Sequence, residues 1–223
     1  MNPRRHHSLF RHARPQRGVA LIVILMFLLA ITGIAVFSAR NATVSEGVAR
    51  NQLDYEVARQ AAESALRDAE RDLLLPDNLP RPGSLCTRTA PRPLFDQSAD
   101  FEQPNCPQGQ CVASKDANWE TKLNAEVWWP ESRNGLWNND FSSKPSRGAA
   151  AGTNCNFNGG VPLGTYTGTP PINGVVRQPE YLMEYFQMGP KTYFRITARG
   201  FGYTEATQVV LQSYFVPRTL ASN

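Results

Sequence analysis

The sequence predicts an α+β protein in which one long N-terminal helix packs on a C-terminal antiparallel sheet. Three observations predict this fold. Residues 19–37 form an apolar run without a charge, and residues 38–75 continue with small or apolar residues at helical spacing. Residues 178–223 contain three β-rich runs joined by short turns. The intervening residues 76–177 are rich in turn-forming residues, and we expect a variable loop region there with a short strand at 126–130.

Residues 1–18 form a short basic leader ahead of the apolar run. The leader contains five arginines and no acidic residue, whereas the rest of the chain has 18 basic and 19 acidic residues and a net charge of −1. The formal charge of +4 for the whole sequence therefore comes from the leader alone. Because the remainder is nearly neutral, the charge does not indicate a nucleic-acid partner.

All three histidines of the sequence also lie in the leader, at positions 6, 7 and 12. A chain that begins at Val19 has none, which excludes Ser–His and Cys–His nucleophile pairs, histidine metal ligands and histidine acid–base chemistry. We therefore expect no catalytic residues, no metal and no cofactor, and we predict that the protein is not an enzyme.

Four cysteines lie in the region that we expect outside the cytoplasm, where an even number indicates two disulfides. They are Cys86, Cys106, Cys111 and Cys155, and three pairings are possible. We favour Cys106–Cys111, which closes the short 107–110 loop, with Cys86–Cys155 as a long-range bridge. A four-thiolate zinc site is the alternative, but the cysteines lack the paired C-x2-C spacing that is typical of one.

The apolar run at residues 19–37 is interrupted only by Thr32 and Gly33. A helix of this length spans about 28 Å, close to the ~30 Å thickness of the hydrocarbon core of a bilayer. The arginines before the run outnumber the single Arg40 after it, which places the N-terminus in the cytoplasm. The run is longer than the apolar part of a secretory signal, and no A-x-A-like cleavage site follows it. We predict a retained, single-pass transmembrane helix with the rest of the chain in the periplasm.

The helical pattern continues as an amphipathic segment, residues 38–75, until Pro76 ends it. Nine small or apolar residues recur at helical spacing in this segment: Val44, Val48, Tyr55, Ala58, Ala62, Ala65, Leu66, Ala69 and Leu73. The alanines in this stripe allow the close approach of a partner surface. A β-sheet laid across the helix would supply one.

The C-terminal β-rich runs are residues 181–187, 192–202 and 207–216. Apolar residues alternate with more polar ones in the second run, as at Phe194 and Ile196, and the third run alternates in the same way. This alternation predicts a three-stranded antiparallel meander with one face toward a core. The alanine stripe of the helix is the expected cover for that face.

Three residue groups, taken together, resemble the sequence of a known protein family. The basic leader ends in Gly18, directly before the apolar run that starts at Val19. Residues 55–70 are YEVARQAAESALRDAE, and residues 193–202 are YFRITARGFG, followed by VVLQS at 209–213. The first group resembles a prepilin-peptidase site. The other two resemble the N-terminal helix and the C-terminal strands of the PilX family, which are minor pilins of type IV pili.

The resemblance implies a pilin-like fold and a processing site. Prepilin peptidase would cleave between Gly18 and Val19, and the new amino group of Val19 would be N-methylated. Most pilins carry a glutamate at the fifth residue after the cleaved glycine, where it can meet the terminal amine of a neighbouring subunit. Here that residue is Val23. A carboxylate at the bilayer centre costs about 2–3 kcal/mol or more unless it is paired.

The absence of a carboxylate at Val23 predicts a subunit at the end of a fibre. Its own terminal amine could pair with a glutamate of another subunit, although it has no glutamate to offer in return. The alternative is that Val23 is one more lipid-facing residue of a membrane anchor.

The function that the resemblance implies is that of a minor pilin that primes type IV pilus assembly and sits in the tip complex of the fibre. The implied partners are other minor pilins, the major pilin, a large tip adhesin, prepilin peptidase during processing, and inner-membrane lipid before assembly, with no nucleic acid. The implied location is the Gram-negative inner membrane, with the N-terminus cytoplasmic and the rest periplasmic, and then the extracellular fibre, or fimbrium, that serves cell adhesion.

Two other functions remain as alternatives. One is a minor pseudopilin of a type II secretion system, which is built in the same way. The more remote one is a bitopic envelope enzyme or sensor, for which the 18 residues before the apolar run are too few to fold into a cytoplasmic module.

Overall fold

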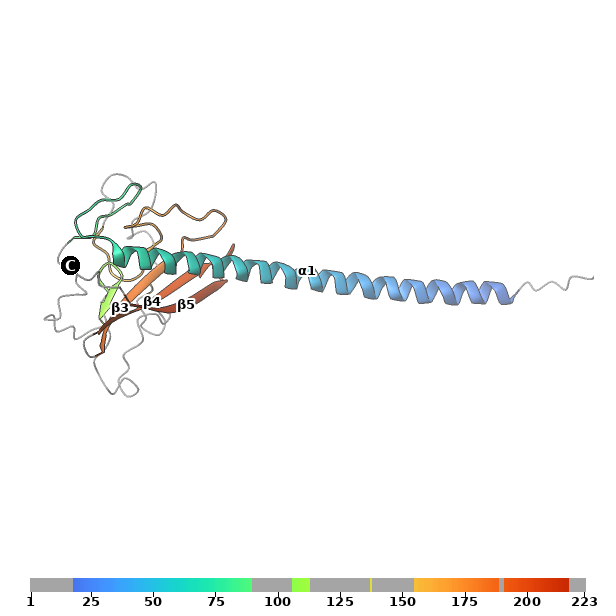
Figure 1. The fold of residues 1–223 in the computed structure, drawn as a ribbon. Coiled ribbons are helices and arrows are strands. Elements are labelled where there is room, and N and C mark those ends of the chain that lie inside the picture. The colour runs from blue at the N-terminus through green and yellow to red at the C-terminus, as the bar shows by residue number, and fades with distance from the viewer. Residues whose placement is uncertain (1–17, 90–105, 113–136, 138–154, 189–190, 217–223) are drawn as a thin grey trace, which may run out of the picture. The chain divides into compact units, whose positions relative to one another are not determined.

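A computed structural model describes residues 18–89, 106–112, 137, 155–188 and 191–216 (Figure 1). The elements in chain order are α1 (Val19–Leu74), β1 (Gln110–Val112), β2 (Val161–Pro162), β3 (Glu180–Met188), β4 (Lys191–Phe201) and β5 (Gln208–Phe215). The chain divides into two compact units, Met1–Arg50 and Asn51–Asn223, and we call the second unit the head. The strand expected at 126–130 and the leader before Gly18 lie outside the described residues.

α1 has the bounds that the sequence predicts to within one residue. It begins at Val19 and ends at Leu74, where the amide of Leu75 donates to the carbonyl of Asp72 (3.1 Å) before Pro76. Every residue of its first part, 19–50, is exposed. The Thr32 hydroxyl donates to the carbonyl of Leu28 (2.6 Å). The one hydroxyl of the apolar run is therefore satisfied within the helix itself, as a lipid environment requires.

Within the head, α1 buries one narrow face that consists of small and acidic residues. Its buried residues recur at intervals of three and four: Ala58, Ala61, Ala62, Ala65, Asp68, Ala69 and Asp72. Leu66 and Leu73 pack against the same core from the side. The alanine stripe predicted from the sequence is therefore the face that meets the sheet.

The residues at the N-terminal end of the predicted stripe, Val44, Val48 and Tyr55, are exposed. Residues 19–53 of α1 are exposed, and Asp54 is the first half-buried residue of the helix; its carboxylate lies against Gly202, the residue that follows β4. A helical period in the sequence shows which side of a helix is apolar, but it does not show where along the helix the partner begins.

The predicted antiparallel meander is formed by β3, β4 and β5. The register pairs Tyr181 with Ala198 and Met183 with Ile196 between β3 and β4. β4 and β5 pair in unbroken register from Phe194–Phe215 to Phe201–Gln208.

The sheet differs from the prediction because it is mixed and has two further strands. β1 pairs with β3 in parallel, and β2 pairs with β3 in the antiparallel sense. Both belong to the region expected to be loops. They contain three and two residues, which is too short for an alternating pattern to be read from the sequence.

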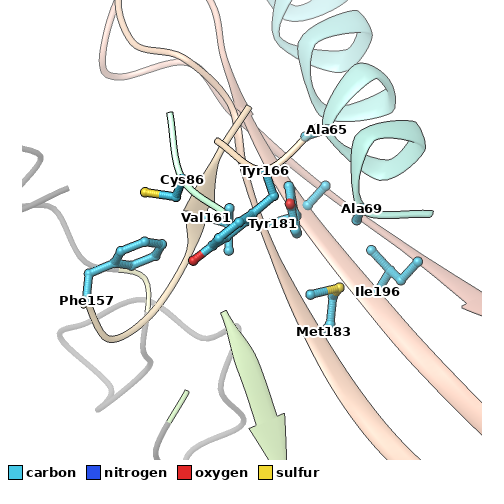
Figure 2. Packing of buried hydrophobic residues seen from close by; sticks show 10 residues of the cluster. Ala65, Ala69, Cys86, Phe157, Val161, Tyr166, Tyr181, Met183 and Ile196 are labelled. Atoms are coloured by element: carbon cyan, nitrogen blue, oxygen red, sulfur yellow. The ribbon is translucent and has the colours of Figure 1, made fainter. Parts of the chain in front are cut away.

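The helix-facing side of the sheet forms the main core of the head. Ala65 and Ala69 of α1 lie opposite Tyr181, Met183 and Ile196 of the strands (Figure 2). A Cβ at Gly200 of β4 would overlap the backbone of Ala58 and Ala62, so the helix and the strand touch with no side chain between them. Only glycine permits so close an approach.

The opposite face of the sheet is also covered near β3, although the sequence predicts only one buried face. Leu182 packs there with Cys106, Cys111 and Trp137. Cross-strand charge pairs flank this second cluster, Glu180 with Arg199 and Glu184 with Arg195. Charged residues at alternate strand positions normally indicate a solvent-facing side. Here their pairing allows them to be buried.

Candidate functional site

The first part of α1 presents a continuous apolar surface. Its large hydrophobic side chains from Val19 to Phe37 are between 46% and 73% exposed, and Val23 is the least exposed of them. Among the described residues, α1 is the one helix that is long and apolar enough to cross a membrane, and none of its apolar stretch is buried by the chain. Such a surface is stable only in lipid or against other apolar helices.

The predicted cleavage point lies at the start of this surface. Gly18 occupies a turn, and α1 begins at the next residue, Val19. No other atom lies within 4 Å of the place where a Cβ of Gly18 would be. The peptide bond between these two residues is therefore at an open junction between the leader and the helix.

Asp54 fastens the β4–β5 turn to α1. Its carboxylate accepts hydrogen bonds from the hydroxyl of Thr207 (2.5 Å) and the hydroxyl of Thr204 (3.2 Å), and from the amide of Tyr203. The bond from Thr207, together with those from Tyr203 and Thr204, holds the pKa of Asp54 below its usual range. A Cβ at Gly202 would overlap the Asp54 carboxylate, which explains the glycine there.

Asp68 fastens the 164–169 loop to the same helix. Its carboxylate accepts from the amide of Gly164 (2.8 Å), from the hydroxyl of Thr167 (2.5 Å) and from the hydroxyl of Thr169. Asp68 is 1% exposed. A buried carboxylate is tolerated when several donors surround it, and here three donors do so.

Asp72 and Arg88 form a buried ion pair at the end of α1. The Arg88 guanidinium donates to both carboxylate oxygens of Asp72, at 3.0 and 2.5 Å, and the Tyr181 hydroxyl donates to the same carboxylate at 2.8 Å. Arg88 also donates to the carbonyl of Gln108 (2.9 Å), and its guanidinium stacks 3.6 Å from the ring centroid of Tyr166. The network thus joins α1, the 85–89 segment, the turn at Gln108 that precedes β1, and β3.

Burial governs the ionisation of this network. Burial by itself would lower the pKa of Arg88, but the neighbouring Asp72 carboxylate outweighs it and raises that pKa above its usual value. Burial raises the pKa of Tyr166 to about 12 and raises the pKa of Tyr181 well above 10. At neutral pH the Arg88 guanidinium is therefore charged and both phenols are protonated.

Two disulfides close the loops around this network. Cys86 is bonded to Cys155, across 69 residues of sequence, and Cys106 is bonded to Cys111. This is the pairing favoured from the sequence, and with all four thiols oxidised a four-thiolate zinc site is excluded. Among the described residues, no group of three His, Cys, Asp or Glu side chains is placed to hold a metal.

The carboxylates that fasten the head were missed by the sequence analysis. Asp68 and Asp72 have a detectable signal, because they continue the three-and-four spacing of the buried alanines, as in Ala61, Ala65, Asp68, Asp72. An acid on a buried stripe predicts an internal partner. The donors on the loops, such as Thr167, follow no sequence pattern of their own.

The described surfaces therefore have different chemistry. The first unit presents an apolar helix that needs partners outside the chain. The head is a helix-backed sheet whose loops are tied by carboxylates and disulfides. An apolar N-terminal helix continuing into a helix that packs on an antiparallel meander is a pilin-like α+β fold.

Comparisons with known proteins agree with this class of protein. The family model described as "Type IV pilus assembly protein PilX C-term" matches residues 83–217, and the model "PilX N-terminal" matches residues 17–67. The chain therefore belongs to the PilX family of type IV pilus assembly proteins. The longer match also includes the middle of the chain, which contains none of the three residue groups that carry the resemblance in the sequence. No curated protein and no solved structure matches the chain.

Membership of this family makes the chain a structural component associated with type IV pilus assembly, of the minor-pilin kind, and implies interaction with other pilus components. The apolar start of α1 fits the membrane anchoring of a pilin.

Proposed function

We propose that this chain is a minor pilin that primes the assembly of a type IV pilus and occupies the tip complex of the fibre. The observation that carries the proposal is the uncharged surface of residues 19–37, which includes Val23 at the fifth position after Gly18. A subunit inside the fibre needs a carboxylate there to meet the amine of its neighbour, and a subunit at the end of the fibre does not.

The proposal includes a processing sequence. The leader stays in the cytoplasm, prepilin peptidase cleaves between Gly18 and Val19, and the Val19 amine is methylated. The apolar helix holds the subunit in the inner membrane, with the head in the periplasm, until assembly moves it into the fibre. The position of Gly18 in an open turn supports cleavage at this bond.

The proposed partners are other minor pilins, the major pilin and a large tip adhesin. A head that is fastened by Asp54, Asp68 and the Asp72–Arg88 pair is suited to display a fixed surface to them. Prepilin peptidase and inner-membrane lipid are contacted earlier, before assembly.

Deletion and substitution at position 23 test the proposal. Deletion of the gene should remove most surface pili, and the full chain should co-purify with other minor pilins. Val23→Glu should raise the number of copies of this subunit per fibre, because the variant then has a carboxylate that can pair with the terminal amine of a subunit already in the fibre. Val36→Glu is the matched control, because Val36 is a valine of similar exposure (51% against 46%) in the same run.

The proposal is wrong if deletion leaves the pili unchanged, or if the chain does not associate with minor pilins under conditions in which these associate with one another. It is also wrong in its tip assignment if Val23→Glu and Val36→Glu have the same effect on copy number. Recovery of the chain with secretion-system pseudopilins instead would identify a pseudopilin.

A further inference from the structure

The sequence has Asn-Gly pairs at 134–135, 158–159 and 173–174, and the last two lie among the described residues. Asparagine is a thermally labile residue. The backbone nitrogen of the next residue can attack its side-chain amide, and a following glycine, which has no side chain, leaves that nitrogen most accessible. The fold treats the reacting groups of the two described pairs in opposite ways.

Asn158 is exposed, but hydrogen bonds hold both of its reacting groups. Its side-chain oxygen accepts from the amide of Cys106 (2.8 Å) and from the amide of Gly159 (3.1 Å). The Gly159 amide also donates to the carbonyl of Cys106 (2.9 Å), and Gly159 is buried. The nitrogen that would attack is therefore held as a donor, and the side chain that would be attacked is held as an acceptor.

Asn173 and Gly174 have no such restraint. Both residues are exposed, and among the described residues neither makes a hydrogen bond. Gly174 has a φ of 86°, and the nearest atom to a Cβ built on it is a ring carbon of Tyr203 at 3.6 Å. The Gly174 nitrogen is thus open to water and free to attack.

The surrounding loop is fixed on both sides of this pair. The Gln178 side chain donates to the carbonyl of Ile172 (2.8 Å) and accepts from the amide of Ile172 (2.8 Å). The amide of Val176 donates to the carbonyl of Gly202 (2.9 Å). Residues 173–175 lie between these bonds, so the tip can change its backbone conformation without breaking any hydrogen bond of the described residues.

We propose that Asn173 is a site of spontaneous modification, at which the chain acquires a carboxylate after it is made. The Gly174 nitrogen loses its proton to hydroxide and forms a bond with Cγ of Asn173. The bond between Cγ and Nδ2 breaks, and Nδ2 takes up a proton and leaves as ammonia, which produces a five-membered cyclic imide. Water then opens the imide at either of its two carbonyl groups and gives aspartate or isoaspartate at position 173.

The modification changes the surface of the head and leaves its core intact. One new carboxylate changes the net charge of the chain after the leader from −1 to −2. Isoaspartate adds one methylene group to the backbone, and the exposed tip takes up this length because the bonds of Gln178 and Val176 fix the loop on both sides. Since the ammonia is lost to water, the change is irreversible and distinguishes older copies of the chain from newer ones.

Peptide mapping of the purified full-length chain in detergent tests the proposal. The folded chain is kept in mildly alkaline buffer, and mass spectrometry measures asparagine, aspartate and isoaspartate at both positions over time. Asn173 should react at least about ten-fold faster than Asn158, because the hydrogen bonds of Asn158 and Gly159 must break before that pair can react. The product at position 173 should contain both aspartate and isoaspartate, which only the cyclic imide gives.

The same chain, reduced and unfolded in denaturant, is the matched control. Unfolding removes the hydrogen bonds of Asn158 and Gly159, so the two Asn-Gly pairs should then react at similar rates. The proposal is overturned if Asn173 reacts no faster than Asn158 in the folded chain, or if Asn173 reacts only after unfolding. A product that contains aspartate alone would also overturn it, because direct hydrolysis of the side chain gives no isoaspartate.

Discussion

Two regions of the same helix, residues 19–37 and residues 58–72, differ in every respect that determines their partners. The first has large apolar side chains, all exposed. The second has alanines and two carboxylates on its buried face, with partners on the strands and loops of the head. The difference shows that one continuous helix serves two purposes. Its first region is made for contacts outside the chain, and its second region is completed by contacts inside it.

The largest expected effect comes from breaking an internal partner of the second region. Asp72→Ala leaves the buried Arg88 guanidinium and the Tyr181 hydroxyl without their shared acceptor. Loss of one member of a buried pair costs about 3–5 kcal/mol. Thermal or denaturant unfolding of the full chain in detergent should show this loss.

The matched control is Glu46→Ala. Glu46 pairs with Arg50 on the helix surface at 2.5 Å, but their side chains are 61% and 77% exposed. Such a pair contributes at most about 0.5 kcal/mol. A similar loss in both variants would contradict the distinction between the internal and external regions of the helix.

A charge in the first region should act on insertion rather than on folding of the head. Leu29→Lys places an ammonium group near the middle of the apolar run, which costs about 3 kcal/mol on insertion. Val44→Lys, at a residue with the same 67% exposure outside the run, should be tolerated. Membrane fractionation measures the difference, and equal insertion of the two variants would show that residues 19–37 are not the anchor.

Glycine-to-alanine substitutions show whether an added Cβ meets a neighbouring atom in each of the two regions. A Cβ at Gly200 meets the backbone of Ala58 and Ala62, which cannot move out of its way, so Gly200→Ala should destabilise the head by about 1–3 kcal/mol. Gly33→Ala meets no atom within 4 Å and should stabilise the helix by up to about 1 kcal/mol. Calorimetry should give opposite signs. A destabilising Gly33→Ala would indicate a partner inside the chain for the first region.

The smallest expected effect is a loss of the folding stability of the head at alkaline pH. Burial raises the pKa of Tyr166 to about 12, whereas an unfolded tyrosine has a pKa near 10. Because the folded state favours the protonated phenol, its contribution is full below pH 10 and is lost as the pH rises toward 12. Tyr166→Phe should make this decline shallower, with Tyr181 responsible for the remainder. An unchanged pH profile of unfolding would show that the Tyr166 phenol is not protected.

The sequence predicts the parts of this fold that depend on a regular period. The bounds of α1 follow from the charge-free apolar run and from Pro76, whereas the alanine face and the three strands of the meander follow from spacing. The favoured disulfides follow from compartment and loop length. A period does not indicate how far along the helix a partner extends, and Val44 and Val48, which share the period, are exposed. β1 and β2 are too short to have a period at all.

The fastening contacts of the head depend on long-range placement, and this is why the sequence did not predict them. Asp54 meets a turn about 150 residues later in the chain, and Asp68 meets a loop about 100 residues later. Each carboxylate on its own is compatible with a solvated helix surface. Only the folded chain brings Thr207 to Asp54 and Gly164 to Asp68.

The central claim is that the first region of α1 becomes an assembly surface after the leader is removed. Mass spectrometry of the N-terminal peptide of this chain, taken from sheared pili of cells with and without prepilin peptidase, tests it most directly. The account predicts a peptide that begins with N-methylated Val19 in the pili and an uncut chain in the membranes of peptidase-deficient cells. A mature chain that still begins at Met1, or one that begins beyond Ala39 and has therefore lost the apolar helix, would contradict it.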